Sequence, residues 1–362
     1  MDSAAIDNAP AGTIPTRATV RGLVGLQQRG LLGPEVSPGL QRVAERYAVA
    51  VTETVAGLIA RDPDGPLARQ YLPSEAEGVD APGEIEDPIG DKAHSPLRGL
   101  VHRYPDRVLL KLTHACPVYC RFCFRREQVG PGGDALGKAD VEAALDYIRA
   151  HREIWEVVFS GGDPFYLPAR KLKTVLSEID AIDHVEVVRF HTRVPVVLPQ
   201  VIDDAMLEAL RRRSATYVVV HVNHRDELTP EGVAALRRLS RAGITLLSQT
   251  VLLRGVNDHA GVLAELFRAL VANNVKPYYL HQLDPARGTS HFRVPIARGQ
   301  EIVRQLRGSV SGLCQPTYML DIPGGHGKVP IGPDYLSAMD GGYEVTDPQG
   351  TAHVYPEPNV SP

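Results

Sequence analysis

The stretch THACPVYCRFCFRRE, residues 113–127, follows a short apolar run, VLLKLT, and carries three cysteines. Cys116, Cys120 and Cys123 have the spacing C-x3-C-x2-C. Structural zinc needs four ligands, usually in two separated pairs, although His114 could supply a fourth ligand here. A [4Fe–4S] cluster that is held by three thiolates keeps one of its irons open for another ligand.

An open iron can bind the amino and carboxylate groups of S-adenosylmethionine. The cysteine spacing, placed directly after a strand, therefore predicts that Cys116, Cys120 and Cys123 hold a [4Fe–4S] cluster that serves S-adenosylmethionine chemistry. A zinc site is the alternative. Cys314, the fourth cysteine, lies far along the chain, and we expect it to take no part.

The composition is that of a globular protein with a modest net charge. The chain has 362 residues, of which 43% are hydrophobic, and its net charge of −4 gives no reason to expect a nucleic-acid partner. No apolar run reaches the roughly 18 residues of a membrane span, and residues 1–20 lack the apolar core of a secretion signal. Four cysteines do not make a disulfide framework, so we expect a cytoplasmic protein without a membrane partner.

Apolar runs typical of strands alternate with amphipathic helical patterns along most of the chain. This alternation predicts parallel βα units, and we favour a partial (βα)6 barrel, an α/β fold, over an open sheet. Residues 17–60 are expected to be helical, and residues 61–100, rich in Pro, Gly and acidic residues, to be an irregular linker. The expected regions are residues 1–100, the barrel at 101–315 and a short C-terminal segment at 316–362. The predicted strands begin near Val108, Trp155, Val185, Tyr217, Thr245 and Lys276.

Polar and glycine-rich segments follow the predicted strands, at the end where such barrels carry their chemistry. SGGDP, residues 160–164, follows the second strand, and its two glycines would let the backbone approach a ligand closely. In enzymes that use a cluster and S-adenosylmethionine, a similar loop holds the methionine amino group. Gly-Gly-Asp is also a common turn. We expect cofactor binding by Ser160, Gly161, Gly162 and Asp163.

A lysine near the C-terminus suggests a second cofactor. YMLDIPGGHGKVPI places Lys328 in a glycine-rich loop after a short apolar run. A lysine of this kind can form a Schiff base with pyridoxal 5′-phosphate. On spacing alone, a surface lysine in a loop is the favoured interpretation.

Together these segments resemble the lysine 2,3-aminomutase family of radical S-adenosylmethionine enzymes. The resemblance spans residues 62–331 and is carried by motifs in chain order: GLVHRYPDRVLLKLTHACPVYCRFCFRRE, FSGGDP, RVPVVLPQ, HVNHRDE, SQTVLLRGVND, HQLDPARGTSHFR and DIPGGHGKVP. It implies a pyridoxal-phosphate-dependent radical enzyme that moves the amino group of L-lysine from C2 to C3, giving β-lysine. An isomerase of this kind also needs a low-potential electron donor such as flavodoxin or ferredoxin.

The resemblance assigns roles to individual residues. It implies that Lys328 carries pyridoxal phosphate and that Arg125 binds the substrate carboxylate, as the bidentate geometry of a guanidinium allows. It implies that Asp284 and Asp321 bind the side-chain ammonium of lysine, although both could simply form turns. Further cofactor contacts are implied for Arg103, Tyr104, Arg107, His221 and Gln249.

Other functions stay open at this point. The same chemistry could act on arginine or glutamate, or could make (R)-β-lysine for modification of elongation factor P. A non-catalytic zinc- or cluster-binding protein is the alternative of a different class. Longer family members bind zinc through C-terminal cysteines that support oligomers, whereas no cysteine follows Cys314 here, so we expect no structural zinc and leave a homo-oligomer open. His326 stands where another glycine is expected.

Overall fold

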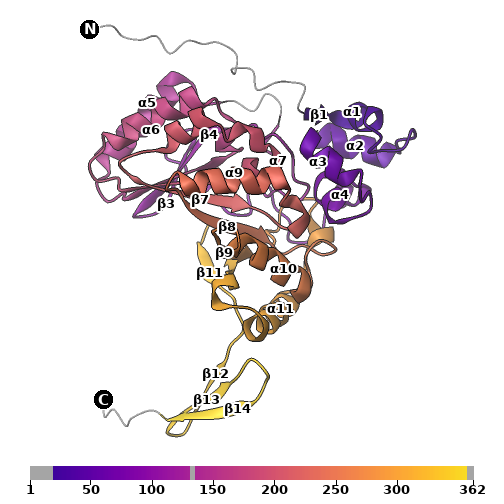
Figure 1. Ribbon diagram of the computed structural model, residues 1–362, viewed down its shortest axis with the longest axis vertical. Helices are drawn as coiled ribbons and strands as arrows, with labels where there is room; N and C mark the ends of the chain where they lie inside the picture. Colours follow the sequence, from indigo (N-terminus) through magenta and orange to yellow (C-terminus); the bar gives the residue numbers. More distant parts are fainter. Residues whose placement is uncertain (1–18, 131–134, 357–362) are drawn as a thin grey trace.

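The computed structural model describes residues 19–130 and 135–356, and its body is one curled, nine-stranded sheet (Figure 1). The order is β11-β10-β9-β8-β7-β6-β5-β4-β3, with β3 and β11 at the two edges. Strands β4 to β10 run parallel, and each edge strand pairs antiparallel with its neighbour. The strands are β3 (Leu100–Tyr104), β4 (Arg107–Thr113), β5 (Glu156–Gly161), β6 (Val187–Thr192), β7 (Ala215–His221), β8 (Thr245–Val251), β9 (Val275–His281), β10 (Thr317–Asp321) and β11 (Lys328–Pro330).

This arrangement confirms the predicted partial barrel, an α/β fold. The six expected strands are β4 to β9, and each is present where the apolar runs placed it. The structure adds β10 as a seventh parallel strand. Its apolar run, TYML, is short, and β11 pairs with it so that Asp321 lies opposite Lys328.

Helices cover the outer face of the sheet (Figure 1). Their apolar residues recur at three- and four-residue steps, so each helix buries one face, as α6 does with Leu172, Val175, Leu176 and Ile179. Helix α9 begins where the hydroxyl of Thr229 accepts a hydrogen bond from the Gly232 amide, with Pro230 in the first turn. The helices are α5 (Lys138–Ala150), α6 (Ala169–Asp180), α7 (Val194–Val197), α8 (Asp204–Leu210), α9 (Pro230–Arg241), α10 (Ala260–Val271) and α11 (Ile296–Ser309).

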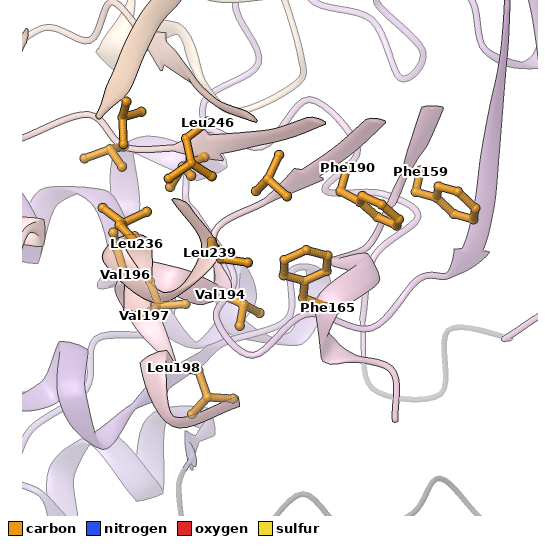
Figure 2. Close-up of a cluster of buried hydrophobic side chains, with 14 of the residues drawn as sticks. Phe159, Phe165, Phe190, Val194, Val196, Val197, Leu198, Leu236, Leu239 and Leu246 are labelled. Atoms are coloured by element: carbon orange, nitrogen blue, oxygen red, sulfur yellow. The ribbon is translucent and has the colours of Figure 1, made fainter. Parts of the chain in front are cut away.

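The two faces of the sheet differ in chemistry. On the outer face, the rings of Phe159 and Phe190 stack with centroids 4.7 Å apart, and Phe165 lies 5.3 Å from Phe190. Figure 2 shows these rings beside the valines of α7 and the leucines of α9. The alternate residues of the same strands, such as Ser160 and His191, face the inner side, where they line a cavity. The core therefore lies under the helices and leaves the concave face for polar groups.

The N-terminal region packs beside the sheet (Figure 1). It contains β1 (Thr19–Arg21), α1 (Gly22–Gln28), α2 (Pro38–Arg46), β2 (Ala50–Thr52) and α3 (Glu53–Ile59), with β1 and β2 paired. The next segment, expected to be irregular, includes the short helix α4 (Pro66–Tyr71). Pro66 occupies its first turn, where proline favours a helix, and Leu67 and Tyr71 are buried.

The remaining elements are short turns and a small C-terminal sheet. Strands β12 (Leu336–Met339), β13 (Gly342–Thr346) and β14 (Ala352–Pro356) form a separate sheet next to α11 (Figure 1). No helix within the described residues is long and apolar enough to cross a membrane. The 3-10 turns are η2 (Glu75–Gly78), η3 (Lys92–His94), η4 (Pro164–Tyr166), η5 (Pro199–Val201), η6 (Arg225–Glu227), η7 (Ser290–Phe292) and η8 (Gly312–Cys314).

Candidate active site

One cavity on the concave face gathers every residue that the sequence predicted for the site. It lies at the carboxyl ends of the parallel strands, where the loops after β4, β5 and β9 meet. The predicted residues that line it are Arg103, Tyr104, Arg107, Cys116, Cys120, Cys123, Arg125, Ser160, Gly161, Gly162, Asp163, His221, Gln249, Asp284, Asp321 and Lys328. Cys314 is buried elsewhere, with the hydrophobic core.

The three cysteines of the loop after β4 are free thiols at one part of this cavity. Burial raises the pKa of each thiol, that of Cys120 to about 11, so positive charge must be supplied to hold them as thiolates. In the part of the chain that the structure describes, no three His, Cys, Asp or Glu side chains converge as they would around a single ion. The sequence spacing C-x3-C-x2-C therefore remains the signal for a four-iron cluster, which takes its thiolates at separate corners.

Gly161 and Gly162 allow the loop after β5 to touch the cysteine loop. The Gly162 amide donates a hydrogen bond of 2.7 Å to the carbonyl of Thr113, and a Cβ on Gly162 would lie 2.3 Å from the carbonyl oxygen of Ala115. Gly161 has a φ of +107°, which side chains rarely adopt. Backbone N–H and C=O groups therefore line the cavity here. They can form hydrogen bonds with a ligand that carries donors and acceptors of its own.

The carboxylate of Asp163 accepts hydrogen bonds from groups of the protein itself. Its carboxylate accepts from the Thr192 hydroxyl at 2.6 Å, the Arg193 amide at 2.7 Å and the Phe165 amide at 3.0 Å. Burial raises the pKa of this carboxyl, although these donors oppose the effect. The side chain thus fixes the glycine loop against β6, and the loop backbone is the part that faces the cavity.

Arg125 is held by two side chains. Its Nε donates to Asp91 at 2.9 Å, and one terminal nitrogen donates to the Ser160 hydroxyl at 3.3 Å. Asp91, which the sequence analysis did not single out, is 2% exposed and also accepts from Lys111 at 3.2 Å. The guanidinium therefore has a defined orientation at the cavity wall.

Lys328 lies at another part of the cavity, at the start of β11. Its ammonium pairs with Asp321, and its backbone amide donates to the Tyr104 hydroxyl at 2.9 Å. The guanidinium of Arg107 lies 3.8 Å from the centre of the Tyr104 ring. A flat aromatic ring, an accessible amine and arginines in one place suit a planar phosphorylated cofactor.

Asp284 and Asp321 influence one another. Burial, and then the charge of Asp321, raises the pKa of Asp284 to about 7. Arg103 lies 3.8 Å from Asp321, and the ring of His281 lies 3.6 Å from it. Among the described residues, Oδ1 of Asp321 is buried without a hydrogen-bond partner. Two neighbouring carboxylates of this kind favour a cationic group between them.

Comparison with known proteins identifies the family. The sequence matches the profile of the radical SAM superfamily over residues 110–267 and that of lysine-2,3-aminomutase over residues 303–361. It is 40% identical to the L-lysine 2,3-aminomutase of Clostridium subterminale over 306 residues, covering 84% of this chain and 74% of that protein. The chain belongs to the lysine 2,3-aminomutase family.

The family contains relatives named for two amino acids. The L-lysine 2,3-aminomutase of Escherichia coli is 41% identical, covering 75% of this chain and 79% of that protein. The glutamate 2,3-aminomutase of Clostridioides difficile is 36% identical, covering 82% and 70%. Membership makes this chain a radical SAM isomerase that uses a [4Fe–4S] cluster and S-adenosylmethionine to rearrange an amino acid.

Several cavity residues of this aminomutase were not singled out from the sequence. Nδ1 of His191 lies 3.1 Å from Nε2 of His221, and Arg189 makes a double hydrogen bond to Glu156 at 2.8 and 2.9 Å. A signal for them exists, because apolar and polar residues alternate in VRFH, residues 188–191, and Arg189 and His191 line the cavity. No such signal exists for Asp91, which precedes the barrel in the acidic linker.

Proposed function

We propose that this enzyme moves the amino group of L-lysine from C2 to C3 and releases β-lysine. The observation that carries the proposal is the pair of carboxylates, Asp284 and Asp321, in the same cavity as Arg125. A substrate with a carboxylate at one end and an ammonium at the other would satisfy both kinds of group. Its ammonium would offset both causes that raise the pKa of Asp284, burial first and then the charge of Asp321.

Three cofactors complete this proposal. Cys116, Cys120 and Cys123 bind the cluster, the glycine loop from Ser160 to Asp163 contacts S-adenosylmethionine, and Lys328 carries pyridoxal phosphate. Arg103, Tyr104 and Arg107 lie beside the pyridoxal phosphate, with His221 and Gln249 at the cavity wall. The cluster and S-adenosylmethionine supply radical chemistry when bound, and pyridoxal phosphate carries the migrating amino group. A flavodoxin or ferredoxin supplies the electron.

The chain's own residues bind and orient the substrate. Arg125, fixed by Asp91 and Ser160, presents its remaining N–H groups to the α-carboxylate. Asp284 and Asp321 hold the distal ammonium and set the reach of the side chain. Strands and loops from the whole barrel line the cavity, so that a bound substrate would be partly shielded from water.

The carboxylate pair also decides between substrates. Glutamate would bring a third negative charge to Asp284 and Asp321, which costs several kcal/mol when like charges meet out of water. This argues against the activity named for the C. difficile relative. Arginine is cationic, but its longer and planar end group would have to fit a site whose carboxylates face a compact ammonium.

The test is turnover with defined amino acids. We expect the anaerobically reconstituted enzyme, with dithionite, S-adenosylmethionine and pyridoxal phosphate, to convert L-lysine to β-lysine, identified by chiral chromatography. Arginine and glutamate at equal concentration serve as the comparison substrates. Each should give less than about a tenth of the product that lysine gives, which is a difference of roughly 1.4 kcal/mol in activation free energy. Conversion of glutamate in preference to lysine would overturn the proposal.

A second arm tests the lysine that carries pyridoxal phosphate. Borohydride reduction and peptide mapping should place the pyridoxyl group on Lys328, and Lys328→Arg should abolish it because a guanidinium does not form the imine at neutral pH. Lys111 is the matched control, because it lies near the site but pairs with buried Asp91. Labelling of Lys111 would show that the wrong lysine was chosen.

A further inference from the structure

One segment of the linker closes over the site; we call residues 84–95 the strap. The strap contacts the loop that carries Asp284, where the Ile85 amide donates to the carbonyl of Pro285 at 2.9 Å. It also contacts the loop before Lys328, where the Gly324 amide donates to the carbonyl of Pro88 at 3.1 Å. The strap therefore touches two loops that carry proposed substrate and cofactor residues.

Asp91 is the strap residue that turns into the cavity wall. Its carboxylate lies 2.9 Å from Arg125, 3.2 Å from Lys111 and 3.7 Å from Arg103. Burial acts to raise its pKa, but Arg125 and Lys111 outweigh burial and hold that pKa well below its ordinary value. Asp91 is therefore ionised at neutral pH.

The cations around Asp91 are shared with other acids of the cavity. One of them, Arg103, also lies 3.8 Å from Asp321, and the charges of Arg125 and Arg103 act on Asp284 as well. An anionic ligand of Arg125 would use the N–H groups that its contacts with the protein leave over. Because Asp91 occupies the Nε edge of Arg125, the anion has to approach the terminal nitrogens instead.

We propose that Asp91 is a positioning residue that orients Arg125 for the α-carboxylate of the substrate, so that carboxylate recognition depends on the strap. This inference rests on the proposed function, because it takes Arg125 as the group that binds the carboxylate. Asp91 does not touch the substrate. It acts by fixing which edge of the guanidinium faces the cavity.

A purely neutralising role for Asp91 makes a different prediction. If only its negative charge mattered, Asp91→Glu should bind the substrate as the parent does, because glutamate keeps the charge and moves the carboxylate by one methylene. If orientation matters, Asp91→Glu should fail, because a bidentate contact tolerates little displacement. Loss of the charge in Asp91→Asn should also free Lys111 to lose its proton, since burial already lowers the pKa of that amine.

The experiment compares two ligands that differ in one group. The reconstituted, pyridoxal-phosphate-loaded enzyme is titrated with L-lysine and with 1,5-diaminopentane, which lacks the α-carboxylate, and binding is followed by the visible absorbance. Asp91→Asn and Asp91→Glu should each raise the Kd of lysine by about tenfold or more, the effect of about one hydrogen bond to a charged group. The Kd of the diamine should change by less than about twofold.

Glu86→Gln is the control within the strap. Glu86 is half-exposed and pairs with Arg287 at 2.8 Å, outside the cavity, and both Kd values should stay within about twofold of the parent. Lysine binding that is unchanged in Asp91→Asn, or fully restored in Asp91→Glu, overturns the inference, as does an equal loss for both ligands. A parent enzyme that binds lysine no better than the diamine would instead overturn the proposed role of Arg125.

Discussion

At the scale of single residues, the substrate-binding role proposed for Asp284 and its contribution to stability oppose one another. Its carboxyl has a pKa of about 7 in the folded protein, raised by burial and by Asp321, against an ordinary value of 3.8. Between these values the folded chain holds a proton that the unfolded chain releases. The contribution of Asp284 to the free energy of unfolding therefore falls as the pH rises from about 4 to 7 and stays low above that range.

This predicts an effect of Asp284→Asn that depends on pH. In the protein freed of cofactors, the variant should be more stable than the parent at pH 8, by roughly 1–3 kcal/mol after allowance for water in the cavity. At pH 4 the two should be nearly equal, which makes pH the internal control. Chemical denaturation at both pH values measures this, and a parent that is as stable as the variant at pH 8 would contradict the prediction. Turnover of lysine should fall at the same time.

Gly162 allows the loop after β5 to lie against the cysteine loop. A methyl group on it would lie 2.3 Å from the Ala115 oxygen, against backbone that cannot move aside. We expect Gly162→Ala to lose at least half of its iron on reconstitution and about 1–3 kcal/mol of stability. Gly130→Ala is the matched control, since its nearest contact would be the Ala48 methyl at 3.8 Å. Iron content that is equal in the two variants would show that the close approach is unimportant.

At the scale of elements, the sequence predicted what depends on local pattern. Strands β4 to β9 were found because their apolar runs and spacing are local properties, and β10 was noticed as an apolar run but not counted as a barrel strand. Helix α4 was missed because the proline and glycine around it were taken as marks of irregular chain. Pairings over long separations, such as Glu77 with Arg121, leave no pattern that a single sequence can reveal.

Glu77 ties the turn η2 to the cysteine loop and should be costly to neutralise. It is fully buried and pairs with Arg121, both oxygens lying 3.0 Å from Nε, and with Arg126. Glu77→Gln would leave two buried guanidinium groups without their partner, and we expect a loss of about 3–5 kcal/mol in urea denaturation.

The control for Glu77→Gln is Glu75→Gln in the same turn. Glu75 is exposed and bonded to the Ser37 hydroxyl, and its replacement should cost less than about 1 kcal/mol. Similar losses in the two variants would mean that Glu77 does not hold the cysteine loop in place.

At the scale of the whole molecule, the site is assembled from segments that the sequence separates widely. The strap, the cysteine loop and the loop before Lys328 come from different parts of the chain, yet the strap contacts both of the others. The motifs predicted residues that do line one cavity, because the carboxyl ends of parallel strands converge. They could not predict how the linker closes it, because that depends on the packing of backbone against backbone.

The contact between Gly90 and the loop before Lys328 tests this closure. Gly90 has a φ of +66°, and a Cβ there would lie 2.7 Å from the backbone of Gly324 and Gly325. Gly83→Ala is a close control, because Gly83 has a φ of +82° and nothing within 4 Å of its Cβ. Both variants suffer the strain of a left-handed alanine, about 1–2 kcal/mol, and they differ in the clash.

We expect Gly90→Ala to push the strap away from the loop and to weaken retention of pyridoxal phosphate by about tenfold or more, a change of roughly 1.4 kcal/mol. Iron content should be unchanged, since the atoms nearest to the added methyl group belong to the loop before Lys328 and not to the cysteine loop. Dialysis followed by absorbance of the bound cofactor measures retention. Equal retention in Gly90→Ala and Gly83→Ala would mean that the strap does not support the lysine loop. Loss of iron together with the cofactor would mean that the clash disturbs the whole cavity rather than its closure.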